Sequence, residues 1–447
     1  MPDVGLLTPG ADLAPGSPAA VTDDVAVLRA MLRAEAAWVR VVAKHRGTRA
    51  GDLDAIEVGT SIDAVVERLA GADDAALALA TQLARESAAG GNPVIPLVAA
   101  LREAAGPRLA PAVHAGLTSQ DVLDTALVLV LREAAHDVVA DLDRAAAAAA
   151  RLAAEHRDRP ALARTLAQAA VPTTLGARFA GWLQGLAAAQ AFLAATADAL
   201  PLAYGGAAGE LSGIAELAEA TGSVEGAADG DPFARVEFAL VEAWGAELGL
   251  PVGPAPWHVT RTPVVRLASA LAESCAALGK IANDVLQAVR PGVGELREPA
   301  APGRGASSAM AHKRNPVLSV LVRRSAIAAP HLAAQVLAAA GLAVDERSDG
   351  AWHAEWPALQ QLARHAIASA HAAAELLEGL EVDADAVARN LHDSLPDAGP
   401  APDVGAATAV VDRVLDGFAD RTSPDGTSPD GTSPDGTSPD RTSTEDA

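Results

Sequence analysis

The feature that most constrains the fold is residues 117–158, a long stretch that contains neither Gly nor Pro. It reads LTSQDVLDTALVLVLREAAHDVVADLDRAAAAAARLAAEHRD, and its Ala, Leu and Val residues recur at helical spacing. A helical pattern of this length is typical of a bundle of extended helices. Similar patterns follow along the chain at 174–200, 235–248, 260–290 and 315–341.

The composition favours an all-α fold. The 447 residues are 50% hydrophobic but only 3% aromatic. β-Sandwiches need aromatic and β-branched residues, whereas helices can pack closely through Ala and other small side chains. We therefore expect an all-α protein of two to three domains. The small-residue faces of its long helices would also suit tight association with copies of the same chain.

The first part of the chain, residues 1–110, is predicted to be a small helical domain. Residues 21–50 form an amphipathic helical pattern with Thr22 and Asp23 as capping candidates. Two shorter helical patterns and a GGNPVIP loop complete this domain, at 60–71, 74–88 and 90–96.

The remainder divides into a central domain of long helices, a smaller helical domain and a tail. We place these at 111–355, 356–418 and 419–447, with the helical pattern of the smaller domain at 356–394. The tail repeats TSPDG, a sequence that cannot hold a helix or bury a core, so we expect it to be disordered and acidic. A dispensable extension is the favoured interpretation, although a functional tail is the alternative.

Charge and cysteine content narrow the possible partners and location. A net charge of −23 argues against nucleic-acid binding, which needs a basic face, but it allows a small anion where cations gather locally. The single cysteine, Cys275, excludes a disulfide framework within the chain. No signal peptide is recognisable, and no uncharged apolar run reaches the roughly 20 residues of a bilayer span. We expect a cytoplasmic protein without a membrane partner.

Three polar segments interrupt the helical patterns: the first segment, VHAGLTSQDVLDTA (113–126), the second segment, ARTLAQAAVPTTLG (163–176), and the third segment, GASSAMAHKRNPV (305–317). Each has a purely structural interpretation as a capping box, a loop or a connector. Yet each lies at a loop or a helix start, where unpaired N–H groups favour anions, and each supplies further donors. They are too far apart to form one local motif, so they could converge only in a folded bundle or between subunits.

The third segment resembles the signature loop of the fumarase/aspartase superfamily, which has a Gly-Ser-Ser-x-Met-Pro-x-Lys-x-Asn-Pro pattern. HAGLTSQDVLDTA and ARTLAQAAVPTTLGARFAGW are similar to two further regions of that superfamily, and the similarity covers most of residues 5–360. GNPVIPLV and the WHAEW block look most like the 3-carboxy-cis,cis-muconate cycloisomerases, which belong to the protocatechuate branch of the β-ketoadipate pathway.

The resemblance implies a three-domain subunit whose long helices associate into a homotetramer with a twenty-helix core. Each active site would take the three segments from three different subunits. The implied reaction converts 3-carboxy-cis,cis-muconate, a small tricarboxylate, into 4-carboxymuconolactone by intramolecular addition of a carboxylate. Proton transfer at carbon would pass through an aci-carboxylate intermediate, which fixed donors in a dry site stabilise.

The family's pattern also implies roles for individual residues. Ser307 would transfer the proton at carbon, and because a serine hydroxyl is a very weak acid it needs positive charge nearby, which Lys313 could supply. His114 is the further predicted catalytic residue. The predicted substrate-binding residues are Thr118, Ser119, Gln120, Thr165, Gln168, Arg261, Ser308, Asn315 and Arg347. Among these, Arg261 and Arg347 are candidates for bidentate carboxylate clamps, whereas His312 is expected to be an exposed loop residue.

The sequence departs from the family's pattern at Leu166, where the superfamily's lyases usually carry a histidine. That histidine belongs to the acid–base pair that serves a poor leaving group, such as an amine or hydroxide. A carboxylate has a pKa near 4 and leaves without an acid. Leu166 therefore fits lactone formation and argues against adenylosuccinate or argininosuccinate cleavage. Such a lyase, or a catalytically silent oligomeric scaffold, is the alternative.

Two smaller departures concern neighbouring loops. Ala311 replaces the usual proline of the signature loop, and Glu210 follows YGGAAG where relatives often carry Thr. The histidines lack metal-ligand spacing, and the sequence has no HExxH motif, Cys-rich site or phosphate-binding glycine loop. Neither a metal nor a cofactor is expected.

Overall fold

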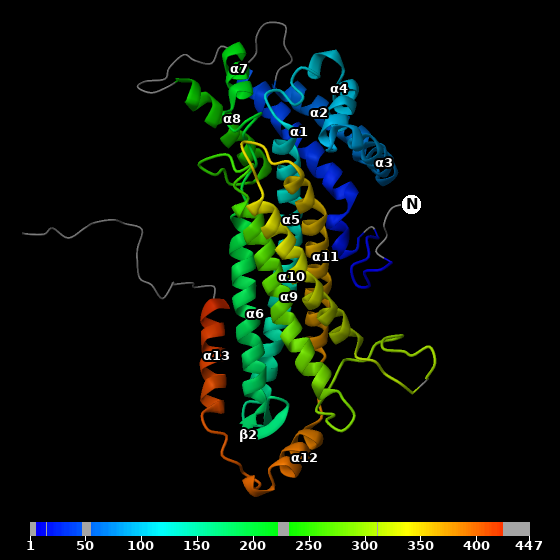
Figure 1. Cartoon of the computed structure of the whole chain (residues 1–447), viewed down its shortest axis with the longest axis vertical. Helices are drawn as coiled ribbons and strands as arrows, with labels where there is room; N and C mark the ends of the chain where they lie inside the picture. The colour runs from blue at the N-terminus through cyan, green and yellow to red at the C-terminus, as the bar shows by residue number, and fades with distance from the viewer. Residues whose placement is uncertain (1–5, 15, 47–54, 222–231, 311, 423–447) are drawn as a thin grey trace, which may run out of the picture.

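A computed structural model describes residues 6–14, 16–46, 55–221, 232–310 and 312–422, which are predominantly helical. Long helices form an elongated bundle, and smaller elements lie at its two ends (Figure 1). The all-α prediction is confirmed. The bundle consists of α5 (Ser119–Glu155), α6 (Leu175–Asp198), α9 (Thr262–Ala288), α10 (Val317–Gly341) and α11 (Gly350–Glu378).

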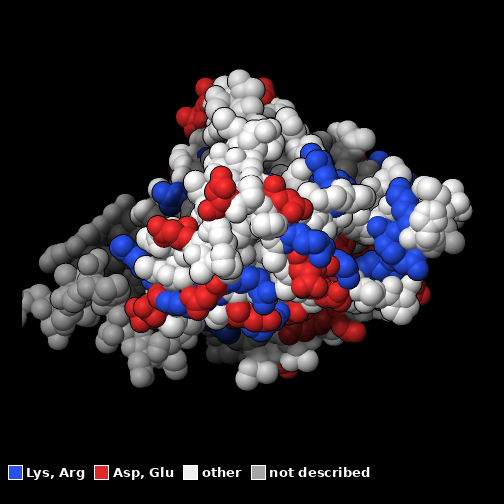
Figure 2. Space-filling model, turned by 90° about the horizontal axis from the view of Figure 1, so that it is seen from below, with Lys and Arg blue, Asp and Glu red and all other residues white. Residues whose placement is uncertain are grey.

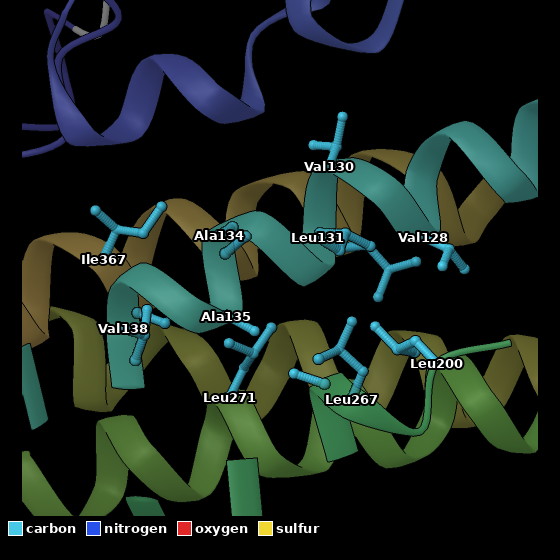
Figure 3. Close-up of a cluster of buried hydrophobic side chains, with 14 of the residues drawn as sticks. Val128, Val130, Leu131, Ala134, Ala135, Val138, Leu200, Leu267, Leu271 and Ile367 are labelled. Atoms are coloured by element: carbon cyan, nitrogen blue, oxygen red, sulfur yellow. The ribbon is translucent and has the colours of Figure 1, made fainter. Parts of the chain in front are cut away.

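Small and branched apolar side chains hold the bundle together. Leu131 and Ala135 of α5 are buried facing Leu267 and Leu271 of α9 (Figure 3). Ile367 of α11 belongs to the same buried cluster. Fully burying a leucine contributes about 1.5–3 kcal/mol. Because alanines separate the larger residues along α5, neighbouring helices can approach closely, as the composition predicted.

The N-terminal helices cover one end of the bundle (Figure 1). They are α1 (Asp24–Arg46), α2 (Ala55–Ala70), α3 (Asp73–Gly90) and α4 (Val94–Leu109), preceded by the short 3-10 helix η1 (Pro18–Thr22). The structure corrects the predicted loop at 90–96, because α4 already begins at Val94. Pro96 then lies in the first helical turn, where a missing N–H removes no helical hydrogen bond. Two more helices, α7 (Ser212–Thr221) and α8 (Pro232–Leu248), lie at the same end.

The opposite end of the bundle carries short strands. β1 (Pro160–Thr165) and β2 (Gln168–Thr174) form an antiparallel hairpin where the sequence predicted a loop or a helix start. β3 (Leu296–Arg297) pairs with β4 (Glu381–Val382), and the chain continues through α12 (Ala384–Ser394), η2 (Pro396–Ala398) and α13 (Ala407–Thr422). Acidic and basic side chains are interspersed over this end of the molecule (Figure 2).

Two of the predicted domain boundaries fall inside helices. The boundary at 355/356 lies within α11, whose later turns pack against α10 and α5 as part of the bundle. α13 extends to Thr422, so the predicted start of the tail at 419 is helical. The rest of the tail, 423–447, lies outside the described residues.

Helix α10 differs from its neighbours in how much apolar surface it exposes. Among the described residues it is the one helix that could cross a membrane by length and composition alone. It nevertheless packs against α9 and α11 within the bundle. Val320, Ile327 and Leu337 lie on its exposed surface.

Candidate active site

The first segment lies at the start of α5, where several loops meet. Thr118 is the N-cap residue, and Asp121 accepts its backbone N–H at 2.8 Å, which confirms the predicted capping box. Thr118 and Ser119 are partly exposed, whereas Gln120 is buried. The start of α5 thus presents the hydroxyls of Thr118 and Ser119 and hides the amide of Gln120.

Gln120 and Arg347 connect the start of α5 to two loops. Arg347 Nη1 donates to Gln120 Oε1 at 2.9 Å, and Arg347 Nη2 donates to the carbonyl of Gly206 at 2.8 Å. The amide of Gln120 donates to the carbonyl of His258 at 2.9 Å. Both residues were predicted to bind substrate, and in this structure their hydrogen bonds also hold the start of α5 against the two loops.

A buried charge cluster lies directly behind the first segment. Arg261 is 3% exposed, and its guanidinium donates to Asp124 Oδ2 at 2.6 Å and to Glu355 Oε2 at 2.7 Å. Trp352 Nε1 donates to Asp124 at 2.9 Å. Burial pushes the pKa of Asp124 up, but Arg261 outweighs burial and holds it below its usual value. Burial dominates at Glu355 and raises its pKa.

The structure therefore corrects the prediction for Arg261. A bidentate substrate clamp needs a guanidinium that faces outward, whereas the N–H donors of Arg261 are occupied by two internal carboxylates. Sequence reasoning also missed the contact between His258 Nε2 and Asp121 Oδ1, which are 2.9 Å apart and both buried. The WHVTR block is thus part of the framework that holds the start of α5.

The second segment forms the hairpin at the far end of the bundle. One strand is anchored near the turn by Arg164, which donates to the buried carboxylate of Glu295 at 2.6 Å. Burial raises the pKa of Glu295, but Arg164, Asn390 and Arg178 together lower it below its usual value. The tip is at the surface: Leu166 is 98% exposed.

The turn of this hairpin has an unusual conformation. Leu166 and Ala167 join the strands with φ values of 50° and 63°. Positive φ at both central residues is typical of a type I′ turn, which normally carries Asn or Gly. Thr165 and Gln168, both predicted to bind substrate, flank the turn and are exposed. Leu166 thus lies at the exposed tip of the hairpin.

The third segment is a loop that directly precedes α10 in the sequence, and hydrogen bonds join its two ends. Asn315 donates its backbone N–H to the carbonyl of Gly305 at 2.9 Å and its side-chain amide to the same oxygen at 3.3 Å. Gly305 has a φ of 68°, and a Cβ there would lie 2.5 Å from the carbonyl oxygen of Asn315. The segment therefore requires glycine at 305, and Asn315 has a structural role beside its predicted one.

Ser307 is the residue of this loop whose environment suits proton transfer. Its Oγ accepts the backbone N–H groups of Met310 at 3.1 Å and Ala309 at 3.4 Å. Donors of this kind would stabilise an alkoxide. Ser308, His312 and Lys313 are exposed in the same loop, as predicted for His312, whereas Ala311 lies outside the described residues.

Within one chain the three segments do not come together. The start of α9 adjoins the start of α5 through Arg261 and Asp124. α9 then runs for 27 residues, about 40 Å, to the far end of the bundle, and the third segment follows there. The second segment likewise follows the far end of α5 (Figure 1). One chain therefore presents the first segment at one end of the bundle and the other two at the opposite end.

Comparison with known proteins identifies the family to which this arrangement of long helices and polar segments belongs. A family model described as a lyase matches residues 22–329. The chain belongs to this family, which is part of the fumarase/aspartase superfamily. Among the described residues, no group of three or more His, Cys, Asp and Glu side chains is placed to hold a metal ion.

Individual relatives differ in the activities for which they are named. The chain is 48% identical to nitrosuccinate lyase of Streptomyces davaonensis over 394 residues, which cover 87% of this chain and 77% of the relative. It is 39% identical to 3-carboxy-cis,cis-muconate cycloisomerase of Bradyrhizobium diazoefficiens over 376 residues, covering 83% and 76%. The crystal structure of the 3-carboxy-cis,cis-muconate lactonizing enzyme from Pseudomonas putida superposes with a TM-score of 0.73 at 31% identity, covering 93% of this chain and 87% of that one.

Proposed function

We propose that the protein adds or eliminates a weakly basic anion at a small polycarboxylate, with proton transfer at the carbon next to a carboxylate. Leu166 carries this proposal, because it stands where the superfamily's lyases usually place an acid. A weakly basic leaving group needs no proton from the protein. The substrates named for the two relatives both meet this condition, since nitrite and a carboxylate are both weak bases.

Nitrosuccinate is the first candidate substrate, because the relative named for it shares 48% of its residues over most of both chains. In this reaction a base removes the proton from the carbon beside one carboxylate. The electron pair forms the carbon–carbon double bond, and nitrite leaves with the electrons of the carbon–nitrogen bond. The products are fumarate, nitrite and the proton taken up by the base.

3-Carboxy-cis,cis-muconate is the second candidate, supported by the 39% identical relative and the superposed lactonizing enzyme. Here the substrate's own carboxylate adds to an alkene carbon, and the neighbouring carbon gains a proton. The product is 4-carboxymuconolactone. This is the reaction predicted from the sequence, and it needs the same proton-transfer group and the same carboxylate-binding donors.

In either reaction Ser307 exchanges the proton, because the N–H groups of Ala309 and Met310 stabilise its anionic form. Lys313 of the same loop and His114, Thr118 and Ser119 at the start of α5 would bind the substrate carboxylates. Since the loop and the start of α5 lie at opposite ends of one chain, these groups would meet only between subunits.

A homotetramer would bring the opposite ends of different chains together. The exposed apolar side chains of Val320, Ile327 and Leu337 support such an assembly, because isolated subunits rarely leave a long apolar helix face uncovered. The exposed Leu166 would then reach the site of another subunit.

The test is to incubate the protein separately with each candidate substrate. Nitrite and fumarate formation report the elimination, and loss of the conjugated-diene absorbance reports lactone formation. Ser307→Ala is compared with Ser269→Ala, an exposed serine on α9 that serves as the matched control. Turnover of one substrate that Ser307→Ala abolishes and Ser269→Ala preserves would support the proposal. No turnover of either substrate by a correctly folded protein would refute it.

A further inference from the structure

Glu35 on α1 is a completely buried carboxylate with 0% exposure. Its Oε1 lies 2.6 Å from His114 Nδ1, and its Oε2 accepts the backbone N–H of His114 at 3.0 Å. A buried carboxylate is costly unless a partner compensates its charge and occupies its lone pairs. Both oxygens of Glu35 are used to hold one residue of the first segment.

The backbone around His114 is also fixed from the N-terminal domain. Trp38 Nε1 donates to the carbonyl of Ala115 at 2.8 Å, and Arg102 donates to the carbonyl of Val113 at 3.0 Å. His114 itself has a φ of 58°, a left-handed conformation that is uncommon outside glycine. Such a conformation persists only where the surroundings determine it, and it is found most often at functional sites.

The geometry determines which ring nitrogen of His114 remains available. A carboxylate can only accept, so the 2.6 Å contact requires a proton on Nδ1. Nε2 makes no hydrogen bond to any described residue, and the side chain is 15% exposed. Nε2 is therefore the atom that can contact a molecule outside the chain.

We propose that Glu35 is a positioning residue that fixes the orientation of the His114 ring, so that Nε2 points to a substrate carboxylate and can donate to it when the ring carries protons on both nitrogens. This rests on the proposed function, in which the substrate is a polycarboxylate. When Nε2 is also protonated, Glu35 compensates the positive charge on the ring while Nε2–H donates to the substrate. Glu35 would thus act entirely through His114.

A double-mutant cycle tests this arrangement. We expect Glu35→Gln and His114→Asn each to lower kcat/KM about 10- to 100-fold, mainly through a higher KM, which is the size of effect found for the hydrogen-bond partners of metal-binding histidines. Glu35→Gln should have little further effect in the His114→Asn background. Losses that multiply in the double variant would overturn the proposal.

Trp38→Phe is the matched control, because it removes a bond to the same backbone without touching the imidazole. Trp38→Phe should mainly lower thermal stability. Any loss of kcat/KM that it causes should multiply with the loss caused by His114→Asn. If Glu35→Gln fails to fold, Glu35→Asp replaces it in the cycle, since aspartate keeps an acceptor-only carboxylate one methylene shorter. Circular dichroism establishes the fold of each variant.

Binding of succinate, measured by calorimetry through the same cycle, separates this proposal from the proposed function. If neither candidate substrate is turned over but the losses in succinate affinity do not add, the role of Glu35 stands and the proposed reaction falls. If succinate affinity is unaffected by both His114→Asn and Glu35→Gln, or if their losses add in full, the positioning role is refuted.

Discussion

The buried cluster behind the first segment makes a quantitative prediction for Arg261→Met. Methionine keeps much of the volume of the arginine side chain but removes its charge and donors. Arg261 donates to Asp124 and Glu355, each of which is 1% exposed. The variant would leave two carboxylates facing each other in the protein interior without a cation.

The size of the effect follows from burial. Breaking a buried ion pair by removing one partner costs about 3–5 kcal/mol, because the remaining charge is uncompensated. The unfolding entropy of about 2.1 cal/mol/K per residue amounts to roughly 0.9 kcal/mol/K for 447 residues, so the midpoint of thermal unfolding should fall by roughly 3–5 °C. The control is Arg266→Met on the same helix, where the side chain is exposed and the change should be within about 0.5 kcal/mol.

The deficit should also depend on pH. In the parent protein Arg261 holds the pKa of Asp124 below its usual value against the effect of burial, and burial raises the pKa of Glu355. Without Arg261, burial would raise the pKa of both carboxyls in the folded state. A folded state that binds protons the unfolded state has lost becomes less stable as pH rises above about 4.5. The difference between variant and parent should therefore grow from pH 5 to pH 8.

Circular dichroism during heating, repeated across this pH range for the parent, Arg261→Met and Arg266→Met, provides the measurement. An Arg261→Met protein as stable as the parent at pH 8 would refute the argument from burial. A deficit that stays constant between pH 5 and pH 8 would show that lost packing, and not uncompensated charge, causes it.

Three further predictions concern single sites. Gly305→Ala places a Cβ 2.5 Å from the carbonyl of Asn315 at a φ of 68°; we expect at least about a tenfold loss of kcat because the loop that carries Ser307 is displaced, with thermal stability nearly unchanged. Unaltered kcat would contradict this. Burial raises the pKa of the Cys275 thiol to about 12, so a chromogenic disulfide reagent at pH 8 should react on the order of a thousandfold more slowly than with a denatured control; fast labelling of the folded protein would contradict the buried position. Replacing Leu166-Ala167 by Asn-Gly should stabilise the isolated hairpin turn by about 0.5–1 kcal/mol, because these residues tolerate positive φ, and a lower midpoint of thermal unfolding would indicate that Leu166 is packed between subunits.

The long helices were predictable because their signals are local and repeated. Residues 117–158 lack Gly and Pro, and α5 follows that stretch from Ser119 to Glu155. The hairpin at 160–174 was not predicted, since Leu-Ala at its turn replaces the Asn or Gly that marks a type I′ turn. α4 was missed because GGNPVIP has the composition of a loop, although Pro is compatible with the first turn of a helix.

The polar segments were predictable, but the state of each side chain was not. Arg261 looked like a carboxylate clamp, yet the carboxylates it meets, Asp124 and Glu355, come from distant parts of the same chain. Glu35 was missed because one glutamate in an amphipathic helix normally faces solvent. Its signal was its position, between Ala34 and Ala36 and three residues before Trp38, on the face of α1 that packs against the bundle.

The division of the polar segments between the two ends of the chain leads to a final prediction. If each site takes His114 from one subunit and Ser307 from another, two variants that are each strongly impaired at low substrate concentration can complement each other under that condition. In tetramers assembled at random from equal amounts of His114→Asn and Ser307→Ala chains, half of the contributed first segments and half of the third segments are intact. About a quarter of the sites then hold both residues, so co-expressed chains should recover about a quarter of the parent activity. Separately purified variants that are mixed without subunit exchange provide the control. Activity that stays at the level of the single variants after co-expression, in tetramers shown by mass spectrometry to contain both chains, would mean that His114 and Ser307 do not meet across a subunit interface.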